Sequence, residues 1–219
     1  MSELELLPDP DAVARRGAEL VASWARAAVA ERGRFSFAVS GGHTPWDMFA
    51  RLRDEDVPWA ETAIWQVDER VAPAGDPDRN LAHLLASLPA QADAEVHPMP
   101  VEEDDLDAAA ARYARSLPER LDLVHLGLGP DGHTASLVPG DPVLEVADRD
   151  VAVTEPYQGR PRMTLTYPVL NRARQVLWLV TGADKAAALA RLLAGDPSIP
   201  AGRVEAESQL IVVDAATQG

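Results

Sequence analysis

The 219-residue sequence predicts an α/β fold, a three-layer α/β/α domain with a mainly parallel sheet. Strand-like apolar runs alternate with segments whose apolar residues have helical spacing, and this order builds βαβ units. Glycine-rich or polar loops follow several strands, and ligands of such sheets bind beyond the carboxyl ends of the strands. The chain contains no internal repeat and no long linker, so we expect a single domain over residues 1–219.

The first expected element is a long amphipathic helix over Asp11–Arg32, which a glycine ends. A strand over Phe35–Val39 leads into a glycine turn. Thr44 is expected as the N-cap, and Pro45 as the first residue, of a helix that ends at Arg53. The chain therefore begins with a helix, a strand, a glycine loop and a second helix.

The rest of the chain continues this alternation. Apolar runs predict strands at 62–67, 95–101, 121–126, 151–154, 163–166, 176–181 and 209–213, and helices are expected at 80–88, 104–117 and 184–193. Unusual loops follow four strands, and because all four lie at carboxyl ends they can converge on one cleft. They are the loops after Val39, Val67, Leu126 and Val180.

Composition limits the class of protein. The 35 acidic and 20 basic side chains give a net charge of −15, which repels a phosphate backbone, so we expect no nucleic-acid partner. No run approaches the roughly 18 apolar residues of a membrane span. The N-terminus also lacks a signal-peptide pattern, so we expect a cytoplasmic protein with no membrane partner. The absence of cysteine excludes disulfides and thiolate metal sites.

The SGGHTP loop at residues 40–45 joins a strand to a helix. Its backbone N–H groups can turn toward one point at the helix N-terminus, where the helix dipole favours an anion. That arrangement would hold a phosphate. The same residues also suit a plain tight turn that needs glycine only for its backbone angles, and spacing leaves both interpretations open.

Lys185 is the only lysine among the 20 basic residues. It falls in the first turn of the helix expected at 184–193, where the dipole disfavours a cation by roughly 0.3–1 kcal/mol. A bound phosphate would explain a lysine at this place. The alternative is a solvated side chain, or one paired with Asp184.

The segment Gly127–Gly132 matches the GxGxxG pattern of dinucleotide-binding proteins. Pro130, however, removes a backbone N–H, and Asp131 would put a carboxylate beside the pyrophosphate. The Pro-Gly pair at 139–140 leaves little more than one helical turn after His133, where a full crossover helix is needed. We therefore expect no nicotinamide or flavin cofactor here.

Asp131 and His133 place a carboxylate and an imidazole two residues apart at the mouth of the sheet. Histidine can act as a general base near neutral pH, and a neighbouring carboxylate can orient it or raise its pKa. The alternative is a turn aspartate beside a surface histidine. The other histidines lack zinc-ligand spacing, and His125, inside a strand, is expected to be a core residue with satisfied ring nitrogens.

The Asp68-Glu69-Arg70 segment leaves the strand at 62–67. It can offer a carboxylate to a substrate hydroxyl and a guanidinium to a carbonyl or phosphate. A surface ion pair is the alternative.

Five segments, taken in order, resemble a known family: SGGHTP, WQVDERVAPAGDPDRN, LDLVHLGLGPDGHTASLVPG, RMTLTYPVLNRARQVLWLVTGADKAA and LIVVDAA. From about Ser40 onward the chain resembles 6-phosphogluconolactonases of the glucosamine-6-phosphate isomerase/deaminase-like superfamily. The resemblance implies a Rossmann-like fold of the sugar-phosphate isomerase/deaminase type. It also implies hydrolysis of 6-phospho-D-glucono-1,5-lactone to 6-phospho-D-gluconate in the oxidative pentose phosphate pathway. The implied partner is a small sugar phosphate, with no metal or organic cofactor.

The resemblance also implies roles for site residues. The SGGHTP loop and Lys185 would hold the 6-phosphate with help from Arg162, and His133 would be the acid/base. The implied catalytic residues are His133 and Asp131, and the implied substrate-binding residues are Ser40, Gly41, Gly42, His43, Thr44, Asp68, Arg70, Asn80, Arg162 and Lys185. His43 stands where the superfamily commonly has serine, so one expected hydroxyl is missing.

In the implied mechanism, His133 takes a proton from the water that attacks C1 and returns it to the ring oxygen. Loop N–H groups or Arg70 would meet the oxyanion. The alternatives are an isomerase or deaminase of the same superfamily, such as a glucosamine-6-phosphate deaminase, and a non-catalytic sugar-phosphate sensor. The DER and DGHTASLVPG segments favour the lactonase, and the lack of room for a DNA-binding helix pair disfavours a regulator.

Overall fold

The computed structural model describes residues 2–90 and 92–218. The strands are β1 (Ser2–Leu7), β2 (Phe35–Val39), β3 (Thr62–Gln66), β4 (Asp68–Arg70), β5 (Glu95–His97), β6 (Leu123–Leu126), β7 (Val151–Val153), β8 (Arg162–Leu165), β9 (Val176–Val180) and β10 (Gln209–Asp214). The helices are α1 (Pro10–Arg32), α2 (His43–Arg51), α3 (Asn80–Ser87), α4 (Leu106–Ser116), α5 (Tyr167–Arg172) and α6 (Ala186–Leu193).

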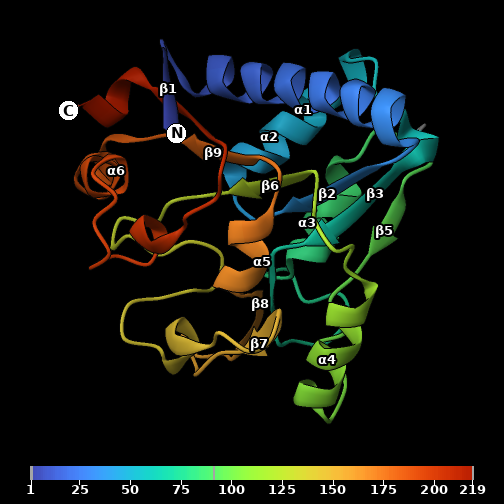
Figure 1. The fold of residues 1–219 in the computed structure, drawn as a ribbon, viewed down its shortest axis with the longest axis vertical. Coiled ribbons are helices and arrows are strands. Elements are labelled where there is room, and N and C mark those ends of the chain that lie inside the picture. The colour runs from blue at the N-terminus through green and yellow to red at the C-terminus, as the bar shows by residue number, and fades with distance from the viewer. Residues whose placement is uncertain (1, 91, 219) are drawn as a thin grey trace.

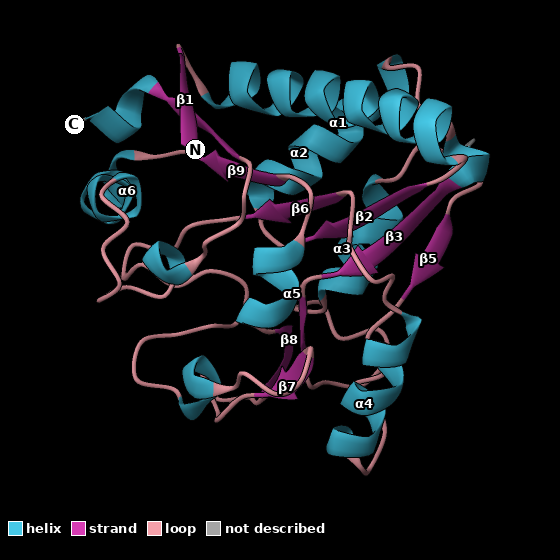
Figure 2. Cartoon of the chain, viewed as in Figure 1, coloured by secondary structure: helices cyan, strands magenta, loops and turns pink. Residues whose placement is uncertain are grey.

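Seven strands form one parallel sheet in the order β1-β10-β9-β6-β2-β3-β5 (Figure 1). One face packs on α1, α2 and α3, and the other on α4, α5 and α6, so the predicted three layers are confirmed (Figure 2). Both faces are covered, and β9 is accordingly buried at every position. Its Leu177 and Leu179 face the first set of helices, while Trp178 and Val180 face the second.

Helix α1 ends at the predicted residue, Arg32, and begins one residue earlier than predicted, at Pro10. The Asp9 side chain accepts a hydrogen bond of 2.8 Å from the backbone N–H of Ala12, which satisfies one free donor of the first turn. Gly33 ends the helix with a φ of 76°, a conformation that costs glycine little. The buried side of the helix is mostly alanine and valine, so α1 lies close against the sheet.

Helix α2 differs from the prediction at its start. Gly42, with a φ of 126°, is the N-cap, and the helix begins at His43. Thr44 is therefore not the N-cap, and its Oγ1 lies 3.0 Å from Oγ1 of Thr181. Glycine allows the sharp change of direction two residues earlier than the predicted threonine cap. The helix predicted at 184–193 is likewise preceded by a 3₁₀ turn over Ala183–Lys185.

Two predicted assignments to the parallel sheet are wrong. Strands β7 and β8 pair antiparallel with each other, and β8 pairs antiparallel with β4, in a separate three-stranded sheet (Figure 1). The DER segment is therefore itself a strand. Strand β1 was not predicted, although its leucines and glutamates alternate with the period of a strand. Its Leu4 and Leu6 are exposed.

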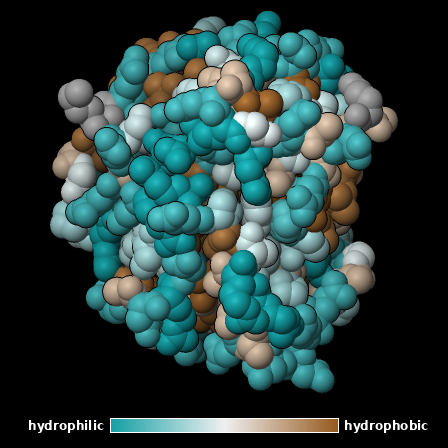
Figure 3. Space-filling view, turned by 45° about the vertical axis from the view of Figure 1, so that its right-hand side comes forward, coloured by the Kyte–Doolittle hydropathy of each residue, from teal (hydrophilic) through white to brown (hydrophobic). Residues whose placement is uncertain are grey.

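The face of the molecule in Figure 3 is mostly hydrophilic, with apolar residues in small separate areas. Among the described residues, none of the helices has both the length and the apolar character to cross a membrane. No α-helix lies between the GxGxxG-like segment and α5; a 3₁₀ turn over Pro142–Glu145 occupies part of that stretch. The crossover helix of a dinucleotide site is thus missing there, as predicted.

Candidate active site

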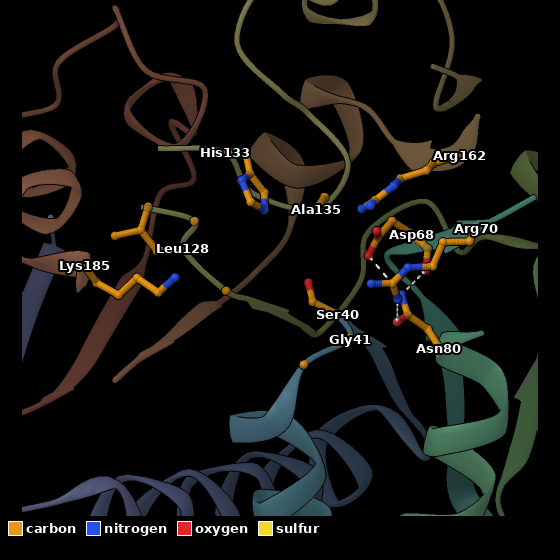
Figure 4. A pocket seen from close by; sticks show the side chains of 13 residues that line it. Ser40, Gly41, Asp68, Arg70, Asn80, Leu128, His133, Ala135, Arg162 and Lys185 are labelled. Carbon is orange, nitrogen blue, oxygen red and sulfur yellow. Dashed lines mark hydrogen bonds between the residues drawn. The ribbon is translucent and has the colours of Figure 1, made fainter. Parts of the chain in front are cut away.

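The four predicted loops meet in one pocket beyond the carboxyl ends of the sheet strands (Figure 4). The residues that line it are Ser40, Gly41, Gly42, Asp68, Arg70, Asn80, Gly127, Leu128, Gly129, His133, Ala135, Arg162 and Lys185. The predicted residues that do not line it are His43 and Thr44, in the first turn of α2, and Asp131. The convergence of the four loops, inferred from the strand order along the chain, is confirmed.

His133 and Asp131 form a close pair at the pocket wall. Nδ1 of His133 lies 2.6 Å from Oδ1 of Asp131, and the His133 backbone N–H donates to the same oxygen at 3.1 Å. Burial raises the pKa of Asp131, but the hydrogen bonds from His133 outweigh it and lower that pKa below its usual value. The ionised carboxylate favours the proton on Nδ1, which leaves Nε2 of His133 as the free acceptor.

Two glycines are required by the close approach of polar side chains. A Cβ on Gly41 would stand 2.0 Å from Oδ1 of Asn80. A Cβ on Gly129 would stand 2.0 Å from Nδ1 of His133. The sequence pattern of these loops therefore reflects contact with site residues as well as turn geometry.

Ser40 and Lys185 enter the pocket from neighbouring loops. The Ser40 hydroxyl donates to the backbone oxygen of His125 at 3.0 Å, which fixes the start of the glycine loop on β6. The amine of Lys185 lies 3.1 Å from Oδ2 of Asp184 and points toward the pocket in Figure 4. Lys185 thus pairs with Asp184 and also lines the pocket, a position compatible with either interpretation.

Across the pocket from Lys185, Figure 4 shows a polar group of Asp68, Arg70, Asn80 and Arg162. The Asn80 side chain donates from Nδ2 to the backbone oxygen of Asp68 at 2.9 Å, and its Oδ1 accepts a hydrogen bond from Arg70. Arg70 forms no ion pair with a carboxylate within the described ranges, so the surface ion pair considered for the DER segment is not found.

The Asp68 side chain is buried, with 5% of the residue exposed. Its Oδ2 accepts a 2.6 Å hydrogen bond from the Ser136 hydroxyl. Burial raises the pKa of Asp68, and this effect exceeds the opposing effects of the Ser136 hydrogen bond and of Arg70 and Arg162. This carboxyl group is therefore more readily protonated than an ordinary aspartate.

Glu69 holds Arg70 and Asn80 in place, a role that was not predicted from the sequence. Its fully buried carboxylate accepts hydrogen bonds of 2.8 Å from the backbone N–H groups of Arg70, Asn80 and Leu81. It thereby caps α3 and fixes the backbone of Arg70 and Asn80, whose side chains line the pocket. The signal for it lies at the N-cap of α3, Arg79, whose side chain has no acceptor and cannot cap a helix.

His125 differs from its prediction. It is fully buried, as expected of a core residue, but neither ring nitrogen has a hydrogen-bond partner. Burial lowers the pKa of His125 to about 3, so the ring is neutral at physiological pH. Over the described ranges, no group of three or more histidine, aspartate or glutamate side chains is placed to hold a metal ion.

Comparison with known proteins places the chain in a family. Residues 8–213 match the family of glucosamine-6-phosphate isomerases/6-phosphogluconolactonase. The chain is 38% identical over 200 residues to a 6-phosphogluconolactonase of Synechocystis sp., covering 84% of this chain and 83% of the relative. For a 6-phosphogluconolactonase of Nostoc sp. the identity is 33% over 235 residues, covering 97% and 95%.

Solved structures agree in fold. A 6-phosphogluconolactonase from Shewanella baltica, at 26% identity, matches with a TM-score of 0.89 over 98% of both chains. A monomeric glucosamine-6-phosphate deaminase, 17% identical, shares the fold with a TM-score of 0.86 over 98% of each chain. The α/β fold class predicted from the sequence is thus confirmed. The chain belongs to the glucosamine-6-phosphate isomerase/6-phosphogluconolactonase family.

Proposed function

We propose that the chain hydrolyses 6-phospho-D-glucono-1,5-lactone to 6-phospho-D-gluconate, the lactonase step of the oxidative pentose phosphate pathway. Relatives at 33% and 38% identity, matched over most of their length, are named 6-phosphogluconolactonases. The observation that carries the proposal is the His133–Asp131 pair at a pocket with Lys185 on one side and two arginines on the other. A general base beside cationic groups suits hydrolysis of an anionic ester.

In this proposal the 6-phosphate binds at Lys185 and the backbone of Gly41 and Gly42. A lysine amine and glycine N–H groups at a helix start are both suited to a phosphate. Thr44 faces Thr181 and adds no hydroxyl there. Because Arg162 lies across the pocket beside Asp68, we assign it to the sugar end of the substrate rather than to the phosphate.

The proposed reaction needs one base that later acts as an acid. Nε2 of His133 takes a proton from water as the water oxygen bonds to C1, and negative charge moves to the carbonyl oxygen. Arg70 and Arg162 stabilise that charge. The bond from C1 to the ring oxygen then breaks, and protonated His133 gives its proton to the departing oxygen. Asp131 holds the imidazole in position throughout.

No serine nucleophile is needed in this scheme. Ser136 is buried, does not line the pocket and donates its hydrogen to Asp68. Ser40 donates to the backbone oxygen of His125, so neither serine is paired with His133. We further propose that the enzyme acts as a single domain in the cytoplasm, without a metal or organic cofactor.

The test is lactone hydrolysis by the purified full-length chain, measured above the spontaneous rate. We expect His133→Ala to lower kcat by roughly 10²- to 10⁴-fold, the usual contribution of a general acid/base, with KM within a few-fold. Asp131→Asn should be milder, since the imidazole remains. Near-normal turnover by His133→Ala would remove this residue from the mechanism.

Two controls separate the alternatives. Activity should persist in EDTA, and its loss on chelation would contradict a metal-free reaction. Ammonia release from glucosamine 6-phosphate, with no lactone hydrolysis, would instead identify the chain as a deaminase. Binding of the sugar phosphate without turnover of either substrate would identify a sensor.

A further inference from the structure

A short hairpin between β7 and β8 contacts residues that line the pocket. Tyr157 and Arg160 pair across a two-residue turn, in which Gln158 and Gly159 have φ values of 53° and 86°. Positive φ at both positions is typical of the tight turns whose twist matches that of a hairpin. Arg160 Nη1 lies 2.8 Å from Oδ2 of Asp76, so the hairpin is anchored on the loop that precedes α3.

Tyr157 contacts two residues of the proposed active site at once. The guanidinium carbon of Arg162 lies 4.9 Å from the centre of the Tyr157 ring, over its face. The His133 imidazole is tilted by 60° to the same ring, with the centroids 5.8 Å apart. One aromatic ring thus touches both the proposed base and a cation that lines the pocket.

Arg162 depends on this contact for its position. The residue is 6% exposed, its Nε has no hydrogen-bond partner, and it forms no ion pair in the described part of the chain. Its guanidinium is held by the 3.0 Å hydrogen bond from Nη2 to Oε1 of Gln158 and by the face of Tyr157. Both contacts come from the same hairpin, which makes the hairpin the support of this cation.

We propose that Tyr157 is a positioning residue of the active site. Its ring face keeps the Arg162 guanidinium directed into the pocket, and its edge limits the tilt of the His133 imidazole. Tyr157 needs no contact with the substrate for this role, and its hydroxyl takes no part. The proposal rests on the lactonase function proposed above.

The test compares kcat and KM for the phosphorylated lactone across matched variants. Tyr157→Leu removes the aromatic face, and we expect kcat/KM to fall about tenfold, the size of a partly desolvated cation–π contact. Tyr157→Phe keeps the face and should recover most of that loss. Arg203→Met is the control, because it removes a guanidinium that lies 4.8 Å over Tyr167, outside the pocket. It should leave kcat/KM unchanged.

A double mutant tests whether Tyr157 acts through Arg162. If it does, adding Tyr157→Leu to Arg162→Met lowers kcat/KM little beyond Arg162→Met alone. Should Arg162→Met fail to fold, Arg162→Lys replaces it, because lysine keeps the charge without the flat guanidinium. Melting curves of every variant check that the fold is retained.

The outcomes distinguish the positioning role from the function on which it rests. A wild-type chain that does not hydrolyse the lactone contradicts the function and the inference together. If the wild type is active, any of three results overturns the positioning role alone. The kcat/KM of Tyr157→Leu equals that of the wild type, Tyr157→Phe and Tyr157→Leu lose equal kcat/KM, or the losses of the two single variants add in the double mutant.

Discussion

At the level of single residues, His125 makes the free energy of unfolding depend on pH. Its pKa is lowered to about 3 by burial, against about 6.5 for an unfolded histidine. Between these values the unfolded state binds the additional proton, so the free energy of unfolding decreases as pH falls from 6.5 toward 3. The decrease contributed by this residue is at most about 1.4 kcal/mol for each pH unit.

We therefore expect His125→Leu to make stability less dependent on pH between 6 and 4. At pH 7 the variant should be at least as stable as the wild type, because it removes two buried nitrogens that lack partners. Urea unfolding at pH 7 and pH 5 measures both effects. The same pH dependence in variant and wild type would mean that folding does not lower the pKa of His125.

Lys185 allows a residue-scale test of phosphate recognition. Lys185→Ala should lower kcat/KM for the phosphorylated lactone by roughly 10- to 150-fold, the equivalent of a charge-assisted hydrogen bond of about 1.5–3 kcal/mol. Gluconolactone without phosphate offers this amine nothing to bind, so its slow hydrolysis should not change. Stability without ligand should be retained, since the lost pair with Asp184 is partly exposed. Equal losses on both lactones would make Lys185 a structural residue.

At the scale of elements, α3 depends on a cap that comes from strand β4. Glu69→Gln keeps an acceptor but removes the charge opposite buried Arg79, whose Nε lies 3.2 Å from Oε2 of Glu69. We expect a loss of about 1–3 kcal/mol in the free energy of unfolding. We also expect a lower kcat, since Arg70 and Asn80 are placed by the same carboxylate.

Asp9→Ala is the matched control, because Asp9 caps α1 and does not line the pocket. It should lower the free energy of unfolding by about 1 kcal/mol and leave kcat/KM unchanged. Urea unfolding and initial rates measure the two quantities. A Glu69→Gln variant that loses stability but not activity would limit Glu69 to a structural role.

The elements that the sequence predicts best are those whose signals are local. The helix expected at Asp11–Arg32 is found at Pro10–Arg32, because its cap, its apolar spacing and its terminal glycine lie in one continuous segment. Strands β7 and β8 were placed in the wrong sheet because a short apolar run suits either sheet. The second partner of β8, β4, is distant in sequence.

In the site, too, the residues that could be predicted are those with a local signal in the sequence. Loops at strand ends identify the residues that line the pocket, because the fold class alone brings those ends together. Glu69 and Tyr157 were missed because their roles consist of contacts with residues 11 and 24 positions away, Asn80 and His133, which no local pattern records. Their contacts depend on how α3 and the β7–β8 hairpin pack against the sheet.

At the scale of the whole molecule, charge is distributed unevenly. The chain has a net charge of −15, yet three cationic side chains line the pocket with one carboxylate, that of Asp68. They are Arg70, Arg162 and Lys185. A small anion is therefore attracted locally, while the overall charge disfavours long polyanions.

The position of β10 has a consequence for how the chain is made. This strand follows every other strand in the sequence and lies between β1 and β9 in the sheet. On the ribosome, β1 emerges first but has no sheet neighbour until residues 209–214 are synthesised. The nascent chain therefore exposes an unpaired strand and an open sheet edge until β10 is synthesised, and chaperones or other chains can bind them during that time.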